Sequence, residues 1–548
     1  MWRSYRRPVT LVRGALVHPG TGDRGMAAGD VRIGDDGRVA AWAPTLSPES
    51  DEEVVDGSGL VLCPGFVDMH SHSDLWTLVR QGPGAPLGDG PKLLQGCTTQ
   101  VFGQDGISAA PVRDDDVEGY AAYIAGLDGY LDPAEWTWRT FGQYLAELRR
   151  RSSTRVAGLV GHATVRRLVM GMDARPPTGD ELAAMQQAID DAMRAGASGM
   201  STGLVYAPAS FADTEELVAL NEVVARHGGR FFVHVRSESD RVVEATAEVL
   251  EVARRTGVHL HYSHIKTAGR ANWPLADRLL EMIAEYQAGG VQVTCDVHPY
   301  TAGSTTATVL LPPWAMEGGR ESAIGRLRSP DDRARMRRQL LDDTTSWDNW
   351  WAFSGGWEGL RIADASRREL VGESFTELLG DHDPLSQEAF DAVFGFLADE
   401  GLAVSLVSFN NVEENVATFL SQSYATVGSD ALVNPTGHPH PRLYGTFPRV
   451  LGRFVRDLGA LSLEDAITAM TGRAADALGL GGGAGRVEVG GPADLVLFDP
   501  ARIVDRATYE EPRLRPVGIE RVWVGGRPVA LQGELAEEIP AAEPFSAR

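Results

Sequence analysis

The chain has 548 residues, of which 43% are hydrophobic, and it carries a formal net charge of −24. A chain of this length can bury more than one hydrophobic core. The acidic charge excludes a basic nucleic-acid-binding surface and opposes attraction to an anionic membrane. The sequence contains no apolar run of about 18 residues and no signal-peptide pattern. We therefore predict a cytoplasmic protein without a membrane span.

Short strands separated by turn residues occur at both ends of the chain. The N-terminal strands are expected at residues 9–12, 14–17, 30–34 and 37–42, and the C-terminal ones at 485–487, 493–498 and 519–526. Residues 1–63 and 481–548 are therefore predicted to pair into one small, discontinuous β-sandwich domain. The three cysteines, Cys63, Cys97 and Cys295, form no paired framework, so we expect a reducing compartment and no structural disulfide.

Between these ends, strands alternate with helices. Strands are expected at residues 66–70, 98–102, 156–162, 199–204, 230–235, 259–265, 291–300 and 425–430, and helices at 180–195, 214–227, 242–256 and 273–288. This α/β alternation predicts a (β/α)8 TIM-like barrel over residues 64–480, with its active site at the carboxyl ends of the strands. Residues 403–409 are also strand-like and form either a ninth strand or the true seventh.

Two stretches interrupt the alternation. Residues 111–150 contain an aromatic-rich loop and a helix, and residues 301–355 add proline, tryptophan and a charged helix. Insertions of this length on a barrel often cover the active site or contact another subunit. We predict a lid insertion at about residues 301–355, with a peripheral helical excursion as the alternative reading.

Side chains that can bind metal follow the ends of the expected strands. His70 and His72 are spaced i, i+2, so on an extended segment both imidazoles point to the same side. The other candidates at strand ends are Asp105, His162, His234, His264, His298 and Asp430. His234 and His264 end neighbouring strands and can converge with the first pair, and neutral imidazole suits zinc. The pattern predicts a metal site.

Two acidic residues complete this prediction. Asp430 ends the last expected strand, where its carboxylate can contact a metal and accept a proton from water; capping the next segment is the alternative. For the second strand, either Cys97 or Asp105 can be the ligand. Cys97 precedes residues 98–102 and so lies at the wrong face, whereas Asp105 follows them. We favour Asp105, with Cys97 in the core.

Several segments resemble the amidohydrolase superfamily and, within it, the N-acyl-D-amino-acid deacylases (D-aminoacylases). The matching segments are residues 64–74, 95–99, 159–162, 199–206, 234–238, 263–266, 298–305, 428–430 and 438–449. They occur in consistent order between about residue 10 and about residue 530. The resemblance implies a (β/α)8 barrel with a small β-sandwich, one or two Zn²⁺ ions and hydrolysis of an N-acyl bond on a D-amino acid.

The resemblance also assigns roles to the candidate residues. It implies that His70 and His72 hold one metal position, that His234 and His264 hold the other, and that Asp430 is the catalytic carboxylate. Many amidohydrolases bridge the metals with a lysine of the fourth strand, but residues 199–204 contain none. The familiar D-aminoacylases use a cysteine in a Gly-Asn-Cys-Gly loop. Here the loop reads Gly-Gln-Asp-Gly, so Asp105 stands where the thiolate would be.

Substrate-binding residues follow from the same resemblance. Lys266, one of only two lysines in the chain, and Arg442 match family positions beside the substrate carboxylate, which cations would bind with charge-assisted hydrogen bonds. His298, Tyr300 and Ser304 lie in a matching segment, and His298 stands where the family often has tyrosine.

The hypothesis is zinc-dependent hydrolysis of N-acyl-D-amino acids to a carboxylate and a free D-amino acid. Dipeptides with a C-terminal D-residue are further candidate substrates. The expected partner is thus a small molecule, not nucleic acid or membrane; the sequence predicts no particular oligomeric state. The alternatives are a cyclic amidohydrolase resembling hydantoinase or dihydroorotase, and a non-catalytic metal- or ligand-binding scaffold.

Overall fold

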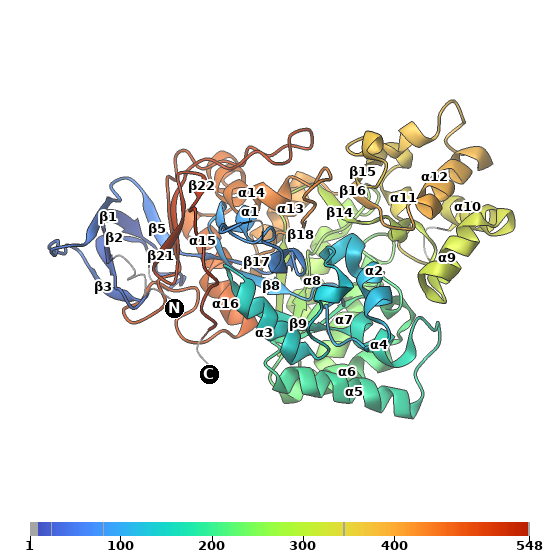
Figure 1. The fold of residues 1–548 in the computed structure, drawn as a ribbon, viewed down its shortest axis with the longest axis horizontal. Helices are drawn as coiled ribbons and strands as arrows, with labels where there is room; N and C mark the ends of the chain where they lie inside the picture. The colour runs from blue at the N-terminus through green and yellow to red at the C-terminus, as the bar shows by residue number, and fades with distance from the viewer. Residues whose placement is uncertain (1–8, 24, 81, 344–345, 546–548) are drawn as a thin grey trace.

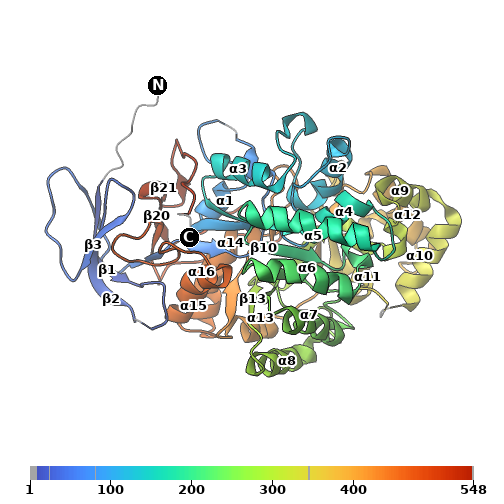
Figure 2. The ribbon, with the colours of Figure 1, turned by 90° about the horizontal axis from the view of Figure 1, so that it is seen from below.

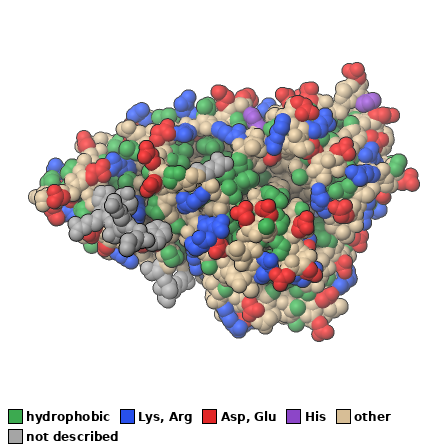
Figure 3. All heavy atoms as spheres, in the orientation of Figure 1, with side chains coloured by type: hydrophobic (Ala, Val, Ile, Leu, Met, Phe, Trp, Pro, Cys, Tyr) green, Lys and Arg blue, Asp and Glu red, His purple; other side chains and the backbone are tan. Residues whose placement is uncertain are grey.

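The computed structural model describes residues 9–23, 25–80, 82–343 and 346–545. The molecule is elongated and has three parts (Figure 1). Strands from both chain ends lie at one end, a barrel of strands and helices lies in the middle, and the insertion that carries α9, α10 and α12 lies at the other end. Acidic and basic side chains are intermixed over the face drawn in Figure 3.

Eight parallel strands form the barrel within the described residues. In spatial order they are β17 (Ala425–Val427), β13 (Val293–Val297), β12 (His259–Tyr262), β11 (Arg230–His234), β10 (Gly199–Gly203), β9 (Arg155–Gly161), β8 (Cys97–Phe102) and β6 (Phe66–Asp68). At the seam, the Met69 amide donates to the Val427 carbonyl over 3.2 Å. Beyond it, β7 (Ser71–His72) pairs in parallel with β18 (Ala431–Leu432). The predicted barrel and its eight strands are confirmed.

Helices cover the outside of the barrel (Figure 2). They include α4 (His162–Met170), α5 (Gly179–Arg194), α6 (Thr214–Arg226), α7 (Val242–Thr256), α8 (Ala276–Ala288) and α13 (Glu413–Leu420). Helix α7 illustrates why they form: Val242, Ala245 and Val249 recur at helical spacing and are buried, while Glu244 stands in the first turn and Arg254 in the last. The apolar face packs on the sheet, and the acidic start and basic end favour the helix dipole.

Strands from the two chain ends share one sheet. Its described members are β1 (Thr10–Val17), β2 (Ala27–Ile33), β3 (Val39–Ala43), β4 (Glu53–Asp56), β5 (Val61–Pro64), β19 (Leu495–Phe498), β20 (Ile519–Val524), β21 (Arg527–Leu531) and β22 (Glu534–Leu535). Strand β5 pairs antiparallel with β19, with Leu62 opposite Leu497. Because β5 leads directly into β6, this sheet fixes the start of the barrel.

A second substructure follows the carboxyl end of barrel strand β13. It contains an antiparallel sheet in the order β14 (Ala302–Thr306), β16 (Ser405–Phe409) and β15 (Leu360–Asp364). Its helices are α9 (Gly319–Arg328), α10 (Pro330–Asp342), α11 (Trp350–Phe353) and α12 (Gln387–Asp399). The insertion, defined here as residues 302–409, buries its own apolar core and continues well past residue 355. Residues 403–409 belong to this sheet and not to the barrel, because β16 pairs with β14 and β15.

The remaining α-helices lie in other parts of the chain. Helices α2 (Val117–Asp128) and α3 (Phe141–Arg151) come from the first interruption, and α1 (Gly90–Leu93), α14 (Arg442–Arg449), α15 (Leu463–Met470) and α16 (Gly472–Leu478) complete the set. Across the described ranges, no helix has both the length and the apolar character needed to cross a membrane.

Candidate metal centre

The predicted ligands meet at the carboxyl ends of the barrel strands. His70, His72, Asp105, His234, His264 and Asp430 follow or end β6, β8, β11, β12 and β17, and all six are buried. Asp105, His264 and Asp430 have φ angles of +53°, +34° and +50°. Positive φ is costly for residues other than glycine and is concentrated at functional sites. The backbone is thus strained at three of the six positions.

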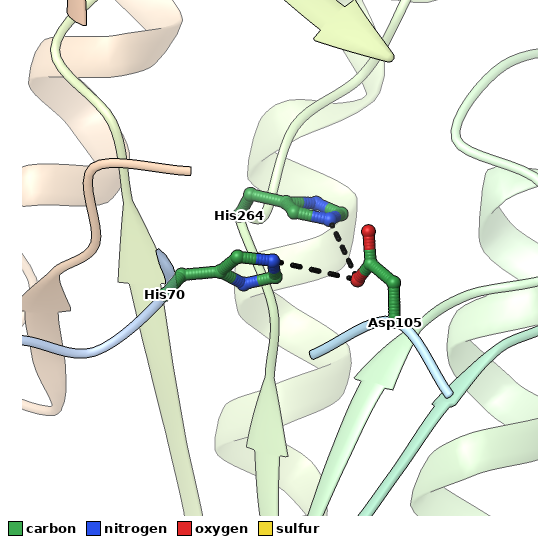
Figure 4. Close-up of side chains that lie close together, drawn as sticks. All are labelled: His70, Asp105 and His264. Carbon is green, nitrogen blue, oxygen red and sulfur yellow. Dashed lines mark ion pairs between the residues drawn. The ribbon is translucent and has the colours of Figure 1, made fainter. Parts of the chain in front are cut away.

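Asp105 lies between two pairs of histidines. Its Oδ1 atom is 3.5 Å from Nε2 of both His70 and His264, as Figure 4 shows. Its Oδ2 atom is 3.5 Å from Nε2 of His72 and 3.7 Å from Nδ1 of His234. Each carboxylate oxygen therefore faces one histidine of each pair. Cys97 is at the opposite end of β8, where its thiol donates to the Thr99 carbonyl over 3.1 Å.

Two further carboxylates stand at the edges of this cluster. Oδ1 of Asp430 lies 3.8 Å from Nε2 of His70 and 3.5 Å from Nε2 of His72. On the other side, Oε1 of Glu238 lies 2.9 Å from Nδ1 of His264. Three sets of side chains bring their donor atoms within 4.8 Å of one another: His70–Asp105–His264, His70–His72–Asp430 and His234–Glu238–His264.

The side chains of this cluster do not satisfy one another's hydrogen bonds, but they can ligate a divalent cation. Nε2 of His70 lies 3.2 Å from Nε2 of His72, and Nδ1 of His234 lies 3.0 Å from Nε2 of His264, so ring nitrogens face ring nitrogens. Oδ1 of Asp105 and Nε2 of His234 are buried and find no hydrogen-bond partner in the part of the chain that the structure describes. Buried polar atoms are rarely left unpaired. Imidazole and carboxylate are the ligands that zinc takes in catalytic sites.

Buried acids orient the first pair of histidines from behind. Nδ1 of His72 lies 3.0 Å from Oδ1 of Asp128, and Nδ1 of His70 lies 3.6 Å from Oδ2 of Asp296. Asp296 also accepts from the backbone amide of His264 over 3.0 Å. Carboxylates that bond the far nitrogen of a metal-ligating histidine fix its tautomer and ring direction. Asp128 thus orients His72 through a hydrogen bond, whereas Asp296 faces His70 as a nearby charge beyond hydrogen-bond distance.

The electrostatics of the site favour positive charge at its centre. Burial alone would raise the pKa of Asp105, but the surrounding histidines, His70 first, hold it well below its ordinary value. Burial likewise opposes ionisation of Asp430, and the Arg442 guanidinium and His72 keep the pKa of its carboxyl group well below normal. Both acids are therefore ionised at neutral pH.

His264 carries the opposite shift. Burial and the nearby Lys266 ammonium lower the pKa of its imidazole, but Glu238 and Asp105 outweigh them and raise it to about 10. Without metal, the histidine therefore holds a proton at neutral pH. A divalent cation at this position must displace that proton, because only neutral imidazole can ligate.

The two cations expected to bind a substrate carboxylate have partners of their own. Nζ of Lys266 donates to Oε1 of Glu238 over 2.6 Å and lies 2.9 Å from Nδ1 of His264. Arg442 is fully buried; its Nη1 donates to Oδ2 of Asp430 and its Nη2 to the Ser304 carbonyl, both over 2.8 Å. Arg442 therefore holds the catalytic candidate Asp430 in position.

Of the other residues expected to bind substrate, Ser304 and His298 lie near the metal centre and Tyr300 does not. Ser304 lines the pocket at the metal centre, defined here as the metal pocket. Nε2 of His298 is 4.0 Å from Oδ2 of Asp430, and burial and the Arg442 charge keep the pKa of His298 well below normal. Tyr300 turns away, because its hydroxyl donates to Asp505 over 3.3 Å.

His162, although at a strand end, lies outside the metal cluster. Its Nε2 atom is 2.8 Å from Oε1 of Glu216, and its Nδ1 atom is 2.8 Å from Oγ1 of Thr202. Both ring nitrogens are therefore occupied by neighbours on β10 and α6, so His162 links a barrel strand to a covering helix.

Several residues of the site were not predicted, because they do not lie at the ends of expected strands. Glu238 lies in the loop four residues after His234, and Asp296 lies two residues before His298, so both sit beside recognised positions. Lys92 shows a different signal, its rarity in an arginine-rich chain. Its buried Nζ bonds Oδ2 of Asp68 over 2.7 Å and also Oγ of Ser429. This bond crosses the barrel seam directly beside the Asp430 loop.

Side chains from outside the barrel complete the metal pocket. Besides the ligands, its lining includes Leu127 of α2, Tyr206, Trp350 of α11 and Asn410. Nε1 of Trp350 is buried and has no hydrogen-bond partner among the described residues. A residue of the insertion that lines the pocket thus carries an unpaired donor.

Comparison with known proteins agrees with this geometry. The model of the amidohydrolase family matches residues 53–352 and 398–530, leaving out a segment within the insertion. The chain is 34% identical to a D-aminoacylase of Alcaligenes xylosoxydans xylosoxydans, over 97% of each chain. It is also 34% identical to an N-acyl-D-glutamate deacylase of that organism, over 94% of this chain and 92% of the other.

The chain is also similar in structure to solved amidohydrolases. The crystal structure of an N-acyl-D-glutamate deacylase from Bordetella bronchiseptica, in complex with zinc and a phosphonate inhibitor, is 30% identical and has a TM-score of 0.78, over 98% of this chain and 100% of that one. An L-hydantoinase from Arthrobacter aurescens is 16% identical, with a TM-score of 0.55 over 98% of this chain and 99% of that one, which shows a shared fold alone.

Proposed function

The chain belongs to the amidohydrolase family, and on that premise we propose that it hydrolyses the amide bond of N-acyl-D-amino acids to a carboxylate and a free D-amino acid. The observation that carries the proposal is the buried cluster of four histidines around Asp105, with Asp430 at its edge. Relatives that act on such substrates match nearly the whole chain.

The cluster would have donors for two zinc ions, with Asp105 placed to contribute to both. His70, His72 and Asp430 would hold one, and His234 and His264 the other, with Asp105 between them. Glu238 supports the second position through its contact with His264. When bound, a zinc ion supplies a Lewis acid that polarises the amide carbonyl and lowers the pKa of a water molecule.

Asp430 is the proposed general base and acid. Its Oδ2 is held by Arg442, while its Oδ1 faces the histidines, so Oδ1 is the oxygen that would both contact the metal and take the proton of the attacking water. The same carboxylate then delivers the proton to the leaving amine as the carbon–nitrogen bond breaks. Arg442 acts through Asp430: it keeps the carboxylate ionised and fixes its direction.

Lys266 is the better candidate to anchor the substrate carboxylate. An ammonium group has three donors, and the structure assigns Nζ of Lys266 contacts with Glu238 and His264. Lys266 also lines the metal pocket, which Arg442 does not. A carboxylate fixed at Lys266, with the amide at the metal centre, defines two of the attachment points that chiral discrimination needs.

The proposal is tested with the zinc-loaded protein and matched D and L substrates. Release of free amine from N-acetyl-D-leucine is compared with release from N-acetyl-L-leucine, together with zinc quantification and a ring-opening assay on hydantoin and dihydroorotate. We expect turnover of the D substrate alone. Equal rates on both enantiomers, or turnover of the cyclic substrates instead, would overturn the proposal.

A variant separates an enzyme from a non-catalytic scaffold. Asp430→Asn should lower kcat by about 10²- to 10⁴-fold, the usual contribution of general acid–base catalysis. The control is Asp213→Asn, because Asp213 caps α6 through the Glu216 amide and asparagine caps equally well. If Asp430→Asn keeps full activity, Asp430 is not the base.

A further inference from the structure

The loop that carries Asp430 is held in an unfavourable backbone conformation. This loop, defined here as residues 428–430, follows β17, and Asp430 has a φ angle of +50° within it. A positive φ is costly for a residue with a side chain, so it persists only where the surrounding contacts outweigh its cost. Because Asp430 is the proposed general base, the contacts that hold the loop also set the direction of its carboxylate.

Residues at the end of β6 bind the backbone of this loop. The Ser429 amide donates to Oδ1 of Asp68 over 2.7 Å. The Asp430 amide donates to the His70 carbonyl over 2.8 Å. The Ala431 amide donates to Oγ of Ser429 over 3.2 Å, and the same hydroxyl donates to Oδ2 of Asp68 over 2.6 Å. The Ser429 side chain therefore ties the loop of the general base to β6.

Lys92 binds the same two oxygen atoms. It belongs to α1 and is fully buried, and its Nζ donates to Oδ2 of Asp68 over 2.7 Å and also to Oγ of Ser429. Asp68 is fully buried as well, so the ammonium compensates a carboxylate charge that would otherwise be buried alone. Lys92, Asp68 and Ser429 thus form a closed triangle in which each side chain bonds the other two.

We propose that Lys92 is a positioning residue for the hydrolysis: through Ser429 it holds the Asp430 loop so that Oδ1 of Asp430 faces His70 and His72. The inference rests on the proposed function. Lys92 does not line the metal pocket, so it influences the reaction only through the residues that it holds. Arg442 fixes the other end of the same residue, because it bonds Oδ2 of the carboxylate. Lys92 thus fixes the backbone of Asp430, and Arg442 fixes its side chain.

The alternative is that Lys92 serves only to compensate the charge of Asp68. In that case its removal would lower the stability and leave kcat of the folded, zinc-loaded protein unchanged. A buried ion pair is by itself weak evidence for stability. Compensation of Asp68 also requires no second bond, whereas the ammonium uses one on the residue directly before the general base. The second bond therefore favours the positioning role.

Two substitutions in the full-length, zinc-loaded protein test the proposal. Lys92→Met removes the ammonium and keeps an unbranched side chain. Ser429→Ala breaks the link to the loop but keeps the ion pair between Lys92 and Asp68, so it remains informative if Lys92→Met does not fold. Each should lower kcat for N-acetyl-D-leucine on the order of 10- to 100-fold, because a small displacement of a reacting group has effects of this size. KM and zinc content should be unchanged.

A double-mutant cycle identifies the residue through which Lys92 acts. Lys92→Met is combined with Asp430→Asn, and kcat and Tm are measured for all four proteins. If Lys92 acts through the Asp430 carboxylate, Lys92→Met should change kcat less than about twofold in the Asp430→Asn background, while its effect on Tm persists. Equal losses of kcat in the two backgrounds would overturn the inference, and so would a loss of zinc that accounts for the loss of activity.

The matched control is Arg166→Met. Arg166 is also fully buried and pairs with Glu216, outside the metal cluster, so its substitution should lower Tm and leave kcat unchanged. If it lowers kcat as much as Lys92→Met does, a general loss of packing explains both effects and the inference fails. No turnover by the unaltered protein overturns the proposed function and this inference with it. Turnover by the unaltered protein, with full kcat in Lys92→Met and Ser429→Ala, overturns the inference alone.

Discussion

The metal centre and the insertion contribute to the same pocket, but they are held in place in different ways. The candidate ligands stand at the ends of barrel strands, where Asp128 bonds the His72 ring and Asp296 bonds the His264 backbone amide. The insertion has a separate apolar core and reaches the pocket through a few side chains, among them Ser304 and Trp350. The barrel therefore carries the metal-binding side chains, whereas the insertion and α2 supply part of the pocket wall.

Removing the central carboxylate should give the largest effect on the barrel side of this comparison. Asp105→Ala takes away the oxygens that face all four histidines, and the loss of several kcal/mol of charge stabilisation corresponds to a fall in activity on the order of 1,000-fold. Zinc content, measured after gel filtration, should fall with it. Unfolding temperature and kcat/KM are recorded on the same preparation.

The matched variant is Asp105→Cys, which restores the thiolate that the resemblance to D-aminoacylases implies at this position. It should recover zinc binding and part of the activity, because thiolate is a good zinc ligand. If Asp105→Ala retains its zinc and its activity, Asp105 does not bridge the two positions.

Lys266 and Arg442 should differ in which kinetic constant they change. Lys266→Met removes the proposed carboxylate anchor, and hydrogen bonds to a charged group contribute about 1.5–3 kcal/mol, so KM should rise roughly 10- to 100-fold. Arg442→Met releases Asp430 and should lower kcat instead, because the carboxylate loses its orientation. Initial rates over a range of N-acetyl-D-leucine concentrations separate the two.

Lys266→Arg is the control for Lys266, since it keeps the charge but not the compact ammonium that fits beside Glu238. A substrate ester that lacks the carboxylate should be insensitive to Lys266→Met. If Lys266→Met changes kcat and leaves KM unaltered, the lysine acts on the metal ligands through Glu238 and does not anchor substrate.

Strand periodicity was sufficient to predict the barrel and which side chains meet at its carboxyl end. Parallel strands of a barrel end at the same face, so His70, Asp105, His234 and Asp430 could be placed together from their positions after strand-like segments. Side-chain pairing was harder to predict. That Arg442 bonds Asp430, and that Tyr300 turns to Asp505, depends on contacts between segments far apart in the chain.

The insertion was less predictable for a related reason. Its sheet pairs β14 with β16, whose sequences lie about a hundred residues apart, and no local pattern distinguishes β16 from a barrel strand. The amidohydrolase model also leaves residues 353–397 unmatched. The apolar core of the insertion forms between segments that are distant in the chain, so a local sequence pattern does not reveal it.

Removing the metal should make stability depend on pH through the barrel. The pKa of His264 is raised from about 6.5 to about 10 by Glu238 and Asp105, against burial. The stabilisation from a raised pKa is fully present below pH 6.5 and is lost as the pH rises towards 10. The chelated protein should therefore lose a few degrees in Tm between pH 7 and pH 10. Glu238→Gln replaces the carboxylate with a neutral amide. Scanning calorimetry of this variant should show a smaller fall in Tm over the same pH range.

The smallest expected effect concerns the insertion. Trp350, a lining residue of the metal pocket, has a buried indole N–H without a partner among the described residues; Trp350→Phe removes this donor and keeps an aromatic ring to pack on Phe353, whose ring centroid is 5.1 Å away. If the N–H donates to the substrate, its loss costs about 0.5–1.5 kcal/mol, so kcat/KM should fall roughly two- to tenfold. The neighbouring Trp351→Phe is the matched control, because Trp351 packs against Trp357 and Phe390 in the core of the insertion and does not line the metal pocket. It should lower Tm without changing kcat/KM. Equal kinetic effects of the two substitutions would mean that the insertion affects the metal pocket only through its packing and not through the Trp350 N–H.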